Sequence, residues 1–406
     1  MLTSKERKKA YNIIKVEGNP NVKKLLKSCI IYGANASGKT NLLRALHTIK
    51  YIVNTSKQLN KGDKLPYFPF LLNVNYERKP TTFEVDFISH NTEYKYSFSY
   101  NEEEIISEEL SYFKGKNEQF IFRRSKNTLE VSDDEDELKG LFKHTGDNVL
   151  FLSKANNEYK PFGPVFEWFN INVNYFEHLS NLPDRITIQY MNRSPENKEK
   201  ILKLLNHADF DISYVAGDEI KMNLSEIEPY ISLIEKMGKV QNRPIEEDNI
   251  VKTEYIRTEL KSTHKRDDGS DVTTNFPEFE SAGTIVFFNL LGFLLDSFEN
   301  HQRVLVFDEF DKSLHTDLIM YLLRIFHDKE YNKVNSQLIV TTHNTRLLSL
   351  DFFRREQIWF TEKKKDTKNT DLYSLYDFEG RVDRSIERAY LTGRYGGLPD
   401  IDERRL

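Results

Sequence analysis

The stretch that decides the fold runs from Ile31 to Asn41 and reads Ile-Tyr-Gly-Ala-Asn-Ala-Ser-Gly-Lys-Thr-Asn. It contains the pattern G-x-x-x-x-G-K-T, a short loop framed by two glycines. The apolar run 29–32 just before the loop predicts a buried strand. After the loop, apolar residues recur at helical spacing, at Leu42, Leu43, Ala45, Leu46 and Ile49. A strand, a glycine-rich loop and a helix in this order predict an α/β domain built around a phosphate-binding loop.

The chemistry of such a loop explains its residue types. Glycines let backbone N–H groups close around an oxyanion, and the positive end of the following helix points at it. The ammonium of Lys39 neutralises charge on the β- and γ-phosphates, and the hydroxyl of Thr40 can ligate magnesium. We therefore expect a nucleoside triphosphate to bind at Gly33, Ala34, Asn35, Ala36, Ser37, Gly38, Lys39, Thr40 and Asn41.

Length and composition limit the remaining choices. The chain has 406 residues, enough for two or three lobes, and its net charge of −5 provides no global basic field to draw it onto nucleic acid. The single cysteine, Cys29, cannot form an intramolecular disulfide and is expected to fill the core. No apolar run reaches membrane-spanning length, and no hydrophobic signal core follows the N-terminus. We therefore expect a soluble cytoplasmic protein with no membrane partner.

Three segments are expected along the chain. Residues 1–148 hold the phosphate loop and an antiparallel β subdomain, because residues 82–88 and 93–100 alternate apolar with polar. An acidic run from Ser132 is expected to be a solvated loop. Residues 149–249 are expected to form a mainly helical insertion. Its apolar residues at helical spacing are Ile201, Leu202, Leu204, Leu205, Ile227, Ile231 and Ile234.

The last segment, residues 250–406, returns to an α/β pattern. A strand is expected up to Thr263 and an apolar helix from Thr284 to about Phe298. The runs 303–307 and 337–341 are near-continuous and apolar, which is typical of parallel strands buried on both faces. The predicted fold class is α/β: a mixed or parallel sheet flanked by helices, with an antiparallel β subdomain and an inserted helical lobe.

Four further motifs accompany the phosphate loop later in the chain. In the run from Val304 to Glu309, an apolar strand ends in two acids, of which Asp308 can hold magnesium and Glu309 can deprotonate water. The simpler interpretation is a strand that ends in two surface acids. His343 follows the strand 337–341 and would face a ligand crevice there. A core or capping histidine is its alternative.

The other two motifs are weaker in isolation. The run from Glu280 to Thr284 places Ser281, Ala282 and Gly283 at the start of an apolar helix, where uncovered N–H groups can bind an anion. Its alternative is a serine N-cap followed by a permissive glycine. The run Phe310–His315 directly after the two acids suits a subunit-contact loop and includes Ser313, Leu314 and His315.

Together these residues resemble the ATP-binding-cassette class of ATPases. The G-x-N-x-x-G-K-T loop and the Glu-Ser-Ala-Gly-Thr run are similar to the branch that contains SMC proteins, RecF-type repair ATPases and OLD (overcoming lysogenisation defect) nucleases. Within that branch the chain resembles stand-alone AAA-family ATPases of bacterial anti-phage and abortive-infection operons, such as the ATPase that accompanies RloB-type proteins. The run from Tyr390 to Pro399 fits the same resemblance.

The resemblance implies a role for each motif. ATP and Mg²⁺ would be the ligands, with Lys39 on phosphate, Thr40 and Asp308 on magnesium, Glu309 as catalytic base and His343 as γ-phosphate sensor. The signature residues Ser281, Ala282 and Gly283 would cover the nucleotide of a partner subunit, and Ser313, Leu314 and His315 would form the D-loop.

Two features depart from that class. The glutamine-bearing loop that joins its two lobes has no clear counterpart, since Gln119 and Gln189 are poor candidates. The sequence also ends at Leu406, and we therefore expect no nuclease domain of the OLD type. We therefore expect a dimeric or higher even-numbered ATPase switch that controls a separately encoded effector, a nuclease or toxin, in phage defence.

Two rival functions stay open at this point. The first is a RecF- or SMC-like ATPase that binds DNA in repair or processing. It predicts a basic face formed by Lys23, Lys24, Lys27, Arg123 and Arg124. The second is an intrinsic ribonuclease that uses Arg257 and His264, although a pair with this spacing is expected by chance among so many basic residues.

Overall fold

The computed structural model describes residues 9–132, 135–223, 226, 256–299, 302–378 and 385–398. The helical spacing expected at Ile227, Ile231 and Ile234, the strand expected over 250–255, and Pro399 lie outside these residues. The chain divides into two compact units. The first unit comprises Met1–Leu179, Ser297–Lys312 and Leu323–Leu406, and the second unit comprises Ser180–Asp296 and Ser313–Leu322.

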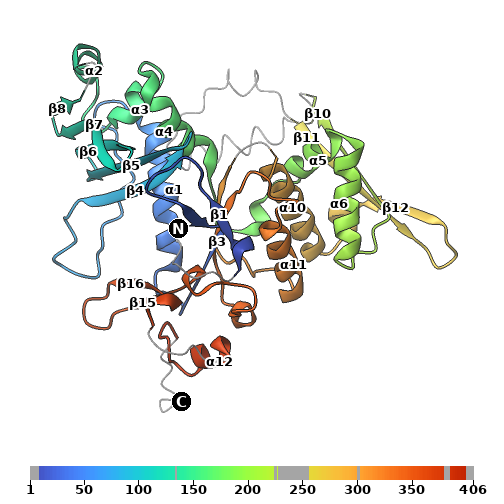
Figure 1. The fold of residues 1–406 in the computed structure, drawn as a ribbon. Helices are drawn as coiled ribbons and strands as arrows, with labels where there is room; N and C mark the ends of the chain where they lie inside the picture. Colours follow the sequence, from blue (N-terminus) through green and yellow to red (C-terminus); the bar gives the residue numbers. More distant parts are fainter. Residues whose placement is uncertain are drawn as a thin grey trace. The chain divides into compact units, whose positions relative to one another are not determined.

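A six-stranded sheet forms the centre of the first unit, in the order β16-β15-β3-β14-β13-β9 (Figure 1). All neighbours from β15 to β9 pair in parallel, and β16 is antiparallel to β15. The strands are β3 (Ser28–Gly33), β9 (Val173–Phe176), β13 (Val304–Phe307), β14 (Gln337–Thr341), β15 (Ile358–Lys363) and β16 (Thr370–Ser374). The expected strands before the phosphate loop and at 303–307 and 337–341 are confirmed, and every residue of β3 is buried.

The helix α1 (Lys39–Thr55) follows β3 and connects two cores of the first unit. Near its start Leu43 packs with Ile31 of β3 and Val306 of β13. Near its end Ile52 and Val53 join an aromatic core. The loop between β3 and α1 is therefore held from both sides by buried apolar side chains.

The aromatic core lies under a five-stranded antiparallel sheet. Its strands follow one another in chain order as β4 (Thr81–Ser89), β5 (Thr92–Tyr100), β6 (Ile105–Lys114), β7 (Asn117–Ser125) and β8 (Thr128–Val131). Alternate residues of β5 are buried, which confirms the antiparallel strands with one wet face. The ring of Phe87 stacks on Trp168 with centroids 4.3 Å apart. The helices α2 (Glu135–Phe142), α3 (Phe151–Ala155) and α4 (Gly163–Glu167) complete this part.

The C-terminal part of the first unit packs beside the edge of the six-stranded sheet. The helix α12 (Ile386–Leu391) begins at the N-cap Ser385 and lies below β15 and β16 in Figure 1. Tyr390 and Tyr395 stack on Phe360 of β15, with centroids 5.4 and 5.7 Å away. A two-stranded ladder of β1 (Ile13–Lys15) and β2 (Lys24–Leu26) precedes β3.

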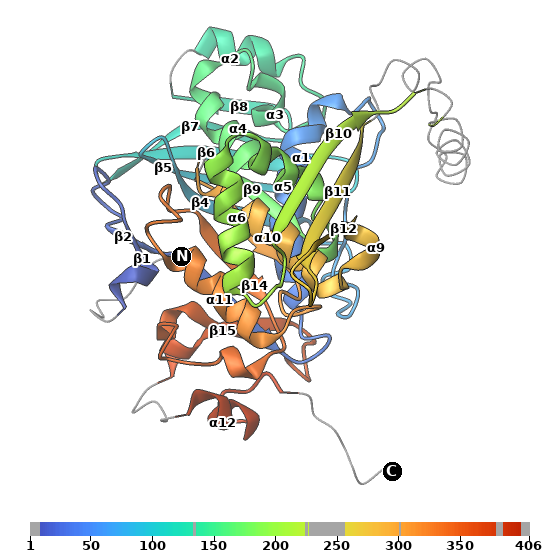
Figure 2. The same cartoon turned by 90° about the vertical axis from the view of Figure 1, so that its right-hand side faces the viewer.

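The second unit combines helices with a three-stranded antiparallel sheet of β10 (Tyr214–Lys221), β11 (Ile256–Lys265) and β12 (Asp271–Asn275). Its helices are α5 (Asp184–Asn192), α6 (Pro195–His207), α9 (Phe276–Phe279) and α10 (Ala282–Ser297). Figure 2 shows the β10–β11 ribbon with α5 beside it. A further helix, α11 (Thr316–His327), begins in the second unit and ends in the first. None of the described helices is both long and apolar enough to cross a membrane.

The segment 149–249 differs from the expected helical pattern because it contains two strands. β9 has only four residues, too few for a clear alternation, and it is completed by its parallel partner β13. β10 packs closely against α5, since a Cβ on its Gly217 would lie 2.7 Å from the side chain of Ile188. The acidic run from Ser132 also differs, since α2 begins within it at Glu135. Acidic residues such as Asp136 favour a helix start through the helix dipole.

Two of the five cations expected on a basic face, Lys27 and Arg124, are buried. Lys27 is buried, and its ammonium donates to the carbonyl of His327 at 3.0 Å. Arg124 is also buried; its guanidinium donates to the carbonyl of Val149 at 2.6 Å and lies 3.7 Å from the carboxylate of Glu108. These two cations serve the interior, so the rival DNA-binding function loses part of the surface on which it rested.

The buried Arg124 gives a stability prediction. Arg124→Ala leaves the carboxylate of Glu108 in the core without its cation, so we expect a loss of about 3–5 kcal/mol in unfolding free energy. The neighbouring Arg123→Ala is the matched control, because Arg123 is exposed where it pairs with Glu109, and it should cost less than about 1 kcal/mol. Urea unfolding followed by circular dichroism measures both. Equal losses would contradict the structural role given to Arg124.

Candidate active site

The loop between β3 and α1 has the backbone of an anion cradle. Ala36 and Gly38 have positive φ angles of 60° and 105°, so the chain makes a tight left-handed turn before the helix. Gly38 is the N-cap of α1, with no side-chain cap and no acidic residue in the first turn. The first N–H groups of a 17-residue helix are therefore left for an external acceptor.

Lys39, the first residue of α1, lies folded back over the loop. Its buried ammonium donates to the carbonyls of Gly33 at 2.7 Å and Ala34 at 3.1 Å. Burial lowers the pKa of Lys39, while the carboxylates of Asp308 and Glu309 act in the opposite direction. The cation is thus placed at the mouth of the loop, within the electrostatic reach of the acids that follow β13.

Those acids are held by the neighbouring strand β14. The hydroxyl of Thr341 donates to the carboxylate of Asp308 and accepts the N–H of Glu309 at 2.8 Å. Asp308 is buried, whereas Glu309 is partly exposed and has a φ of +49°. The Glu309 carboxylate accepts an ion-pair hydrogen bond from Lys312 at 3.1 Å. Thr341 therefore holds two acids in different environments: Asp308 is buried, and Glu309 is accessible to water.

His343 lies two residues beyond the end of β14, on the same edge of the sheet. Its side chain is exposed, and its backbone N–H is 3.3 Å from the carboxylate oxygens of Asp311. Burial of part of the ring and the charge of Lys39 lower the pKa of His343, although Asp311 opposes them. A lowered pKa favours the neutral imidazole, which can donate one hydrogen bond and accept another.

The oxygen donors present fit a magnesium ion in part. Asp308 supplies a carboxylate and Thr40, in the first turn of α1, supplies a hydroxyl, and both are hard ligands of the kind that Mg²⁺ prefers. Among the described residues no group of three or more His, Cys, Asp or Glu could hold a metal ion. A magnesium ion here would keep water molecules and take phosphate oxygens as its remaining ligands.

The residues that the resemblance assigns to the signature and to the D-loop lie in the second unit. Ser281 accepts the N–H of Thr284 at 3.1 Å, so it caps α10 as the simpler interpretation predicts. Ser281 and Ala282 are nevertheless exposed. A Cβ on Gly283 would lie 3.2 Å from the carbonyl oxygen of Ser313, which brings the two motifs side by side. In the D-loop, Leu314 is buried while Ser313 and His315 are exposed.

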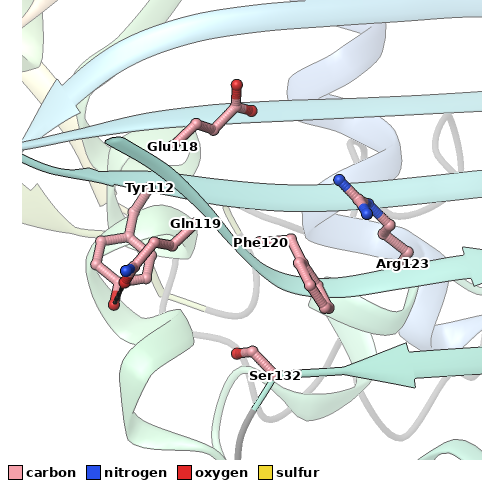
Figure 3. A pocket seen from close by; sticks show the side chains of 6 residues that line it. All are labelled: Tyr112, Glu118, Gln119, Phe120, Arg123 and Ser132. Carbon is pink, nitrogen blue, oxygen red and sulfur yellow. Dashed lines mark hydrogen bonds between the residues drawn. The ribbon is translucent and has the colours of Figure 1, made fainter. Parts of the chain in front are cut away.

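Neither glutamine considered for the glutamine-bearing loop directly follows a strand of the six-stranded sheet. Gln119 is on β7, where it accepts a hydrogen bond from the hydroxyl of Tyr112 at 2.8 Å. Both residues line a pocket of about 500 Å³ on the five-stranded sheet (Figure 3). There the guanidinium of Arg123 lies 4.6 Å from the ring of Phe120. Gln189 is on α5 and donates to Glu219 at 2.8 Å.

The structure shows a different segment where the chain leaves the six-stranded sheet for the second unit. β9 ends at Phe176, whose carbonyl accepts the N–H of Asp308 at 3.0 Å. Glu177 comes next and forms an ion pair with Arg44 of α1. Glu177 and His178 thus follow the sheet edge directly, before the first unit ends at Leu179. Sequence reasoning missed this segment because the strand that positions it is too short to recognise.

The suggested ribonuclease pair is not brought together. Arg257 and His264 lie at opposite ends of β11, and an odd separation along a strand places side chains on opposite faces. Arg257 lies 3.1 Å from Glu259, and His264 is 2.7 Å from Glu280. Both side chains therefore have structural partners.

Comparison with known proteins places the chain in a family. The model of the family described as "AAA domain, putative AbiEii toxin, Type IV TA system" matches residues 29–349. The chain belongs to this family of AAA-type ATPases. Among solved structures it is similar to the SMC head domain from Thermotoga maritima, at 14% sequence identity and a TM-score of 0.40, over 89% of this chain and 96% of that chain. No curated protein matched the sequence.

The position of Lys39 gives a binding prediction. Lys39→Ala removes the ammonium and should leave several phosphate charges unpaired, so we expect no ATP binding in the micromolar range. Titration calorimetry measures it, with Lys24→Ala on the exposed side of β2 as the control that should bind normally. Micromolar ATP binding by Lys39→Ala would count against this site.

Proposed function

We propose that this chain is an ATP-hydrolysing switch that works as a head-to-tail dimer. The observation that carries the proposal is the shared edge of three adjacent strands. β3 ends in the phosphate loop, β13 ends at Asp308 and Glu309, and β14 leads to His343. Ligands of parallel sheets bind at the carboxyl ends of the strands. The phosphate loop, the two acids and His343 therefore follow strands that end at the same edge of the sheet, where they can act on one ligand.

Each residue has a chemical task in this proposal. The loop amides and Lys39 bind the phosphates, and the exchange of carbonyl partners for phosphate oxygens keeps the ammonium paired. When bound, magnesium would neutralise charge on the β- and γ-phosphates. Glu309 accepts the proton of the attacking water, since its partly exposed carboxylate can reach solvent. The neutral imidazole of His343 donates a hydrogen bond to the γ-phosphate.

In this proposal, the segment after β9 acts in the position of the glutamine-bearing loop. Glu177 directly follows Phe176, which pairs in register with Phe307, just before Asp308. A carboxylate or imidazole at Glu177 or His178 can hold a water molecule beside the nucleotide. Because the chain enters the second unit within a few residues, this segment can also couple nucleotide state to that unit.

The dimer part of the proposal rests on the signature residues. Exposed Ser281 and Ala282 at the start of the 16-residue helix α10 leave a polar helix end available to a partner. In the proposed dimer this end covers the γ-phosphate held by Lys39 of the other subunit. The exposed D-loop residues Ser313 and His315, which adjoin Gly283, would lie at the same interface.

The proposed biological setting is supported by the family description, which names a putative AbiEii toxin and a type IV TA system. We propose that the switch controls a separately encoded effector, a nuclease or toxin, in bacterial phage defence. Pulldown from the native host, with and without ATP, tests this. Recovery of an effector in one nucleotide state only is the expected result.

The alternative is a RecF- or SMC-like ATPase that binds DNA directly. Burial of Lys27 and Arg124 weakens the surface first assigned to it. A gel-shift assay with duplex DNA at two salt concentrations separates the proposals, because binding of a protein to the DNA phosphate backbone weakens steeply as salt rises. Strong, salt-sensitive binding would favour the alternative.

Replacement of the proposed base gives the second functional prediction. Glu309→Gln keeps the shape of the side chain but cannot accept a proton, so hydrolysis should fall about 10²- to 10⁴-fold while ATP still binds. Phosphate release measures turnover, and light scattering should detect an ATP-trapped dimer. The control is Glu330→Gln, an exposed residue after α11. Hydrolysis by Glu309→Gln at the wild-type rate would show that Glu309 is not the base.

The trans arrangement gives a third prediction. Gly283→Asp places a negative charge where the partner's γ-phosphate approaches, so this variant should bind ATP but neither close nor hydrolyse it. Gly283→Ala is the steric control, because it adds only the Cβ that would lie 3.2 Å from the carbonyl of Ser313. It should keep more activity than the aspartate variant.

Mixed dimers complete this test. When Gly283→Asp subunits are combined with Lys39→Ala subunits, one site lacks both groups and the other retains both. Partial ATPase activity should therefore return. Full activity of Gly283→Asp alone as a monomer would overturn the proposed head-to-tail dimer. Confirmed heterodimers without activity would show strict coupling of the sites or action of the signature in cis.

A further inference from the structure

The phosphate loop is attached to the hairpin of β15 and β16 by two threonines that no motif identifies. The hydroxyl of Thr370, the first residue of β16, donates to the carbonyl of Ser37 at 2.8 Å. The hydroxyl of Thr361, on β15, lies 2.6 Å from the hydroxyl of Ser37 and also donates to the carbonyl of Tyr32 at 3.3 Å. Both contacts lie within the first unit.

The bond from Thr370 fixes the orientation of one peptide group. In a trans peptide the carbonyl and the following N–H point in opposite directions. Because the carbonyl of Ser37 is turned toward Thr370, the N–H of Gly38 in the same peptide group faces away from the hairpin. This N–H belongs to the group of donors that the loop offers to an anion. If the peptide flipped, it would present a carbonyl oxygen to the phosphate instead.

Close packing at Gly38 supports the same conclusion. A Cβ on Gly38 would lie 2.3 Å from the hydroxyl oxygen of Thr370, so the hairpin rests directly against the loop backbone. Gly38 has a φ of +105°, a conformation that only glycine adopts readily. Glycine residues give a loop several conformations of similar energy, and an external hydrogen bond selects one of them.

Thr361 forms the second, buried contact with the loop. It pairs in register with Gly33, and a Cβ on Gly33 would lie 2.2 Å from its hydroxyl oxygen. Ser37 is itself buried, so its hydroxyl needs this partner. Thr370 is exposed by comparison, and its strand is held by backbone pairing with Lys363. The Thr370 hydroxyl can therefore be removed without disturbing the hairpin.

We propose that Thr370 is a positioning residue for nucleotide binding, which acts by holding the Ser37–Gly38 peptide with its N–H toward the phosphates. This inference rests on the proposed function of the loop. The hydrogen bond from Thr370 lowers the free energy needed to order the loop for binding. Its loss should therefore change nucleotide affinity and KM rather than the rate of the chemical step.

The test compares Thr370→Val, which loses the hydroxyl at nearly constant shape, with Thr370→Ser, which keeps it. Thr370→Val should weaken ADP and ATP binding about fivefold to tenfold in titration calorimetry, the effect of one net hydrogen bond. Its KM should rise by a similar factor, with kcat within about twofold of wild type. Thr370→Ser should bind within about twofold of wild type. Wild-type affinity of Thr370→Val overturns the inference.

A second measurement needs no nucleotide. Hydrogen exchange of the peptide that spans residues 33–42 should be faster in Thr370→Val than in wild type and in Thr370→Ser, while the melting temperature stays unchanged. Unchanged exchange overturns the inference. A wild-type protein that binds no nucleotide would overturn the proposed function instead, and the exchange result would still show whether Thr370 holds the loop.

Discussion

The parallel pairing of β14 with β3 on one side and β13 on the other is the constraint on which the rest of the structure depends. It places three carboxyl strand ends on one edge, although β3 lies far before β13 and β14 in the sequence. The hydroxyl of Thr341, at the end of β14, then links the strand pairing to the two acids, because it donates to the carboxylate of Asp308 and accepts the N–H of Glu309. A shift of β14 by one residue would turn Thr341 to the other face and release both acids.

The features that sequence analysis predicted are those that local chemistry determines. The loop at Gly33–Lys39 needs its glycines for backbone reasons, and the helix after it has a clear apolar face. The strand before Asp308 is apolar because both of its faces are buried. Roles beyond position, such as base or sensor, rest on side-chain chemistry and on the resemblance, and they stay proposals.

The features that sequence analysis missed depend on partners far along the chain. β9 is a strand because β13 lies beside it, and Glu177 reaches the sheet edge only for that reason. Lys27 and Arg124 were expected on a surface because cations usually are, yet carbonyl groups and one carboxylate enclose them. Thr370 has no sequence signal at all, since its importance comes from a hydrogen bond across 333 residues.

The hydrogen bonds of Lys39 suggest how the loop can be both stable and ready to bind. A buried ammonium costs free energy unless it is paired, and the carbonyls of Gly33 and Ala34 supply that pairing within the loop itself. A phosphate that arrives replaces neutral acceptors with charged ones, so the exchange is favourable without any larger rearrangement. In the proposed function, the hairpin threonines hold the loop backbone while the ammonium of Lys39 exchanges its carbonyl partners for phosphate oxygens. A loop backbone that is already held in place would reduce the conformational free energy that binding must supply.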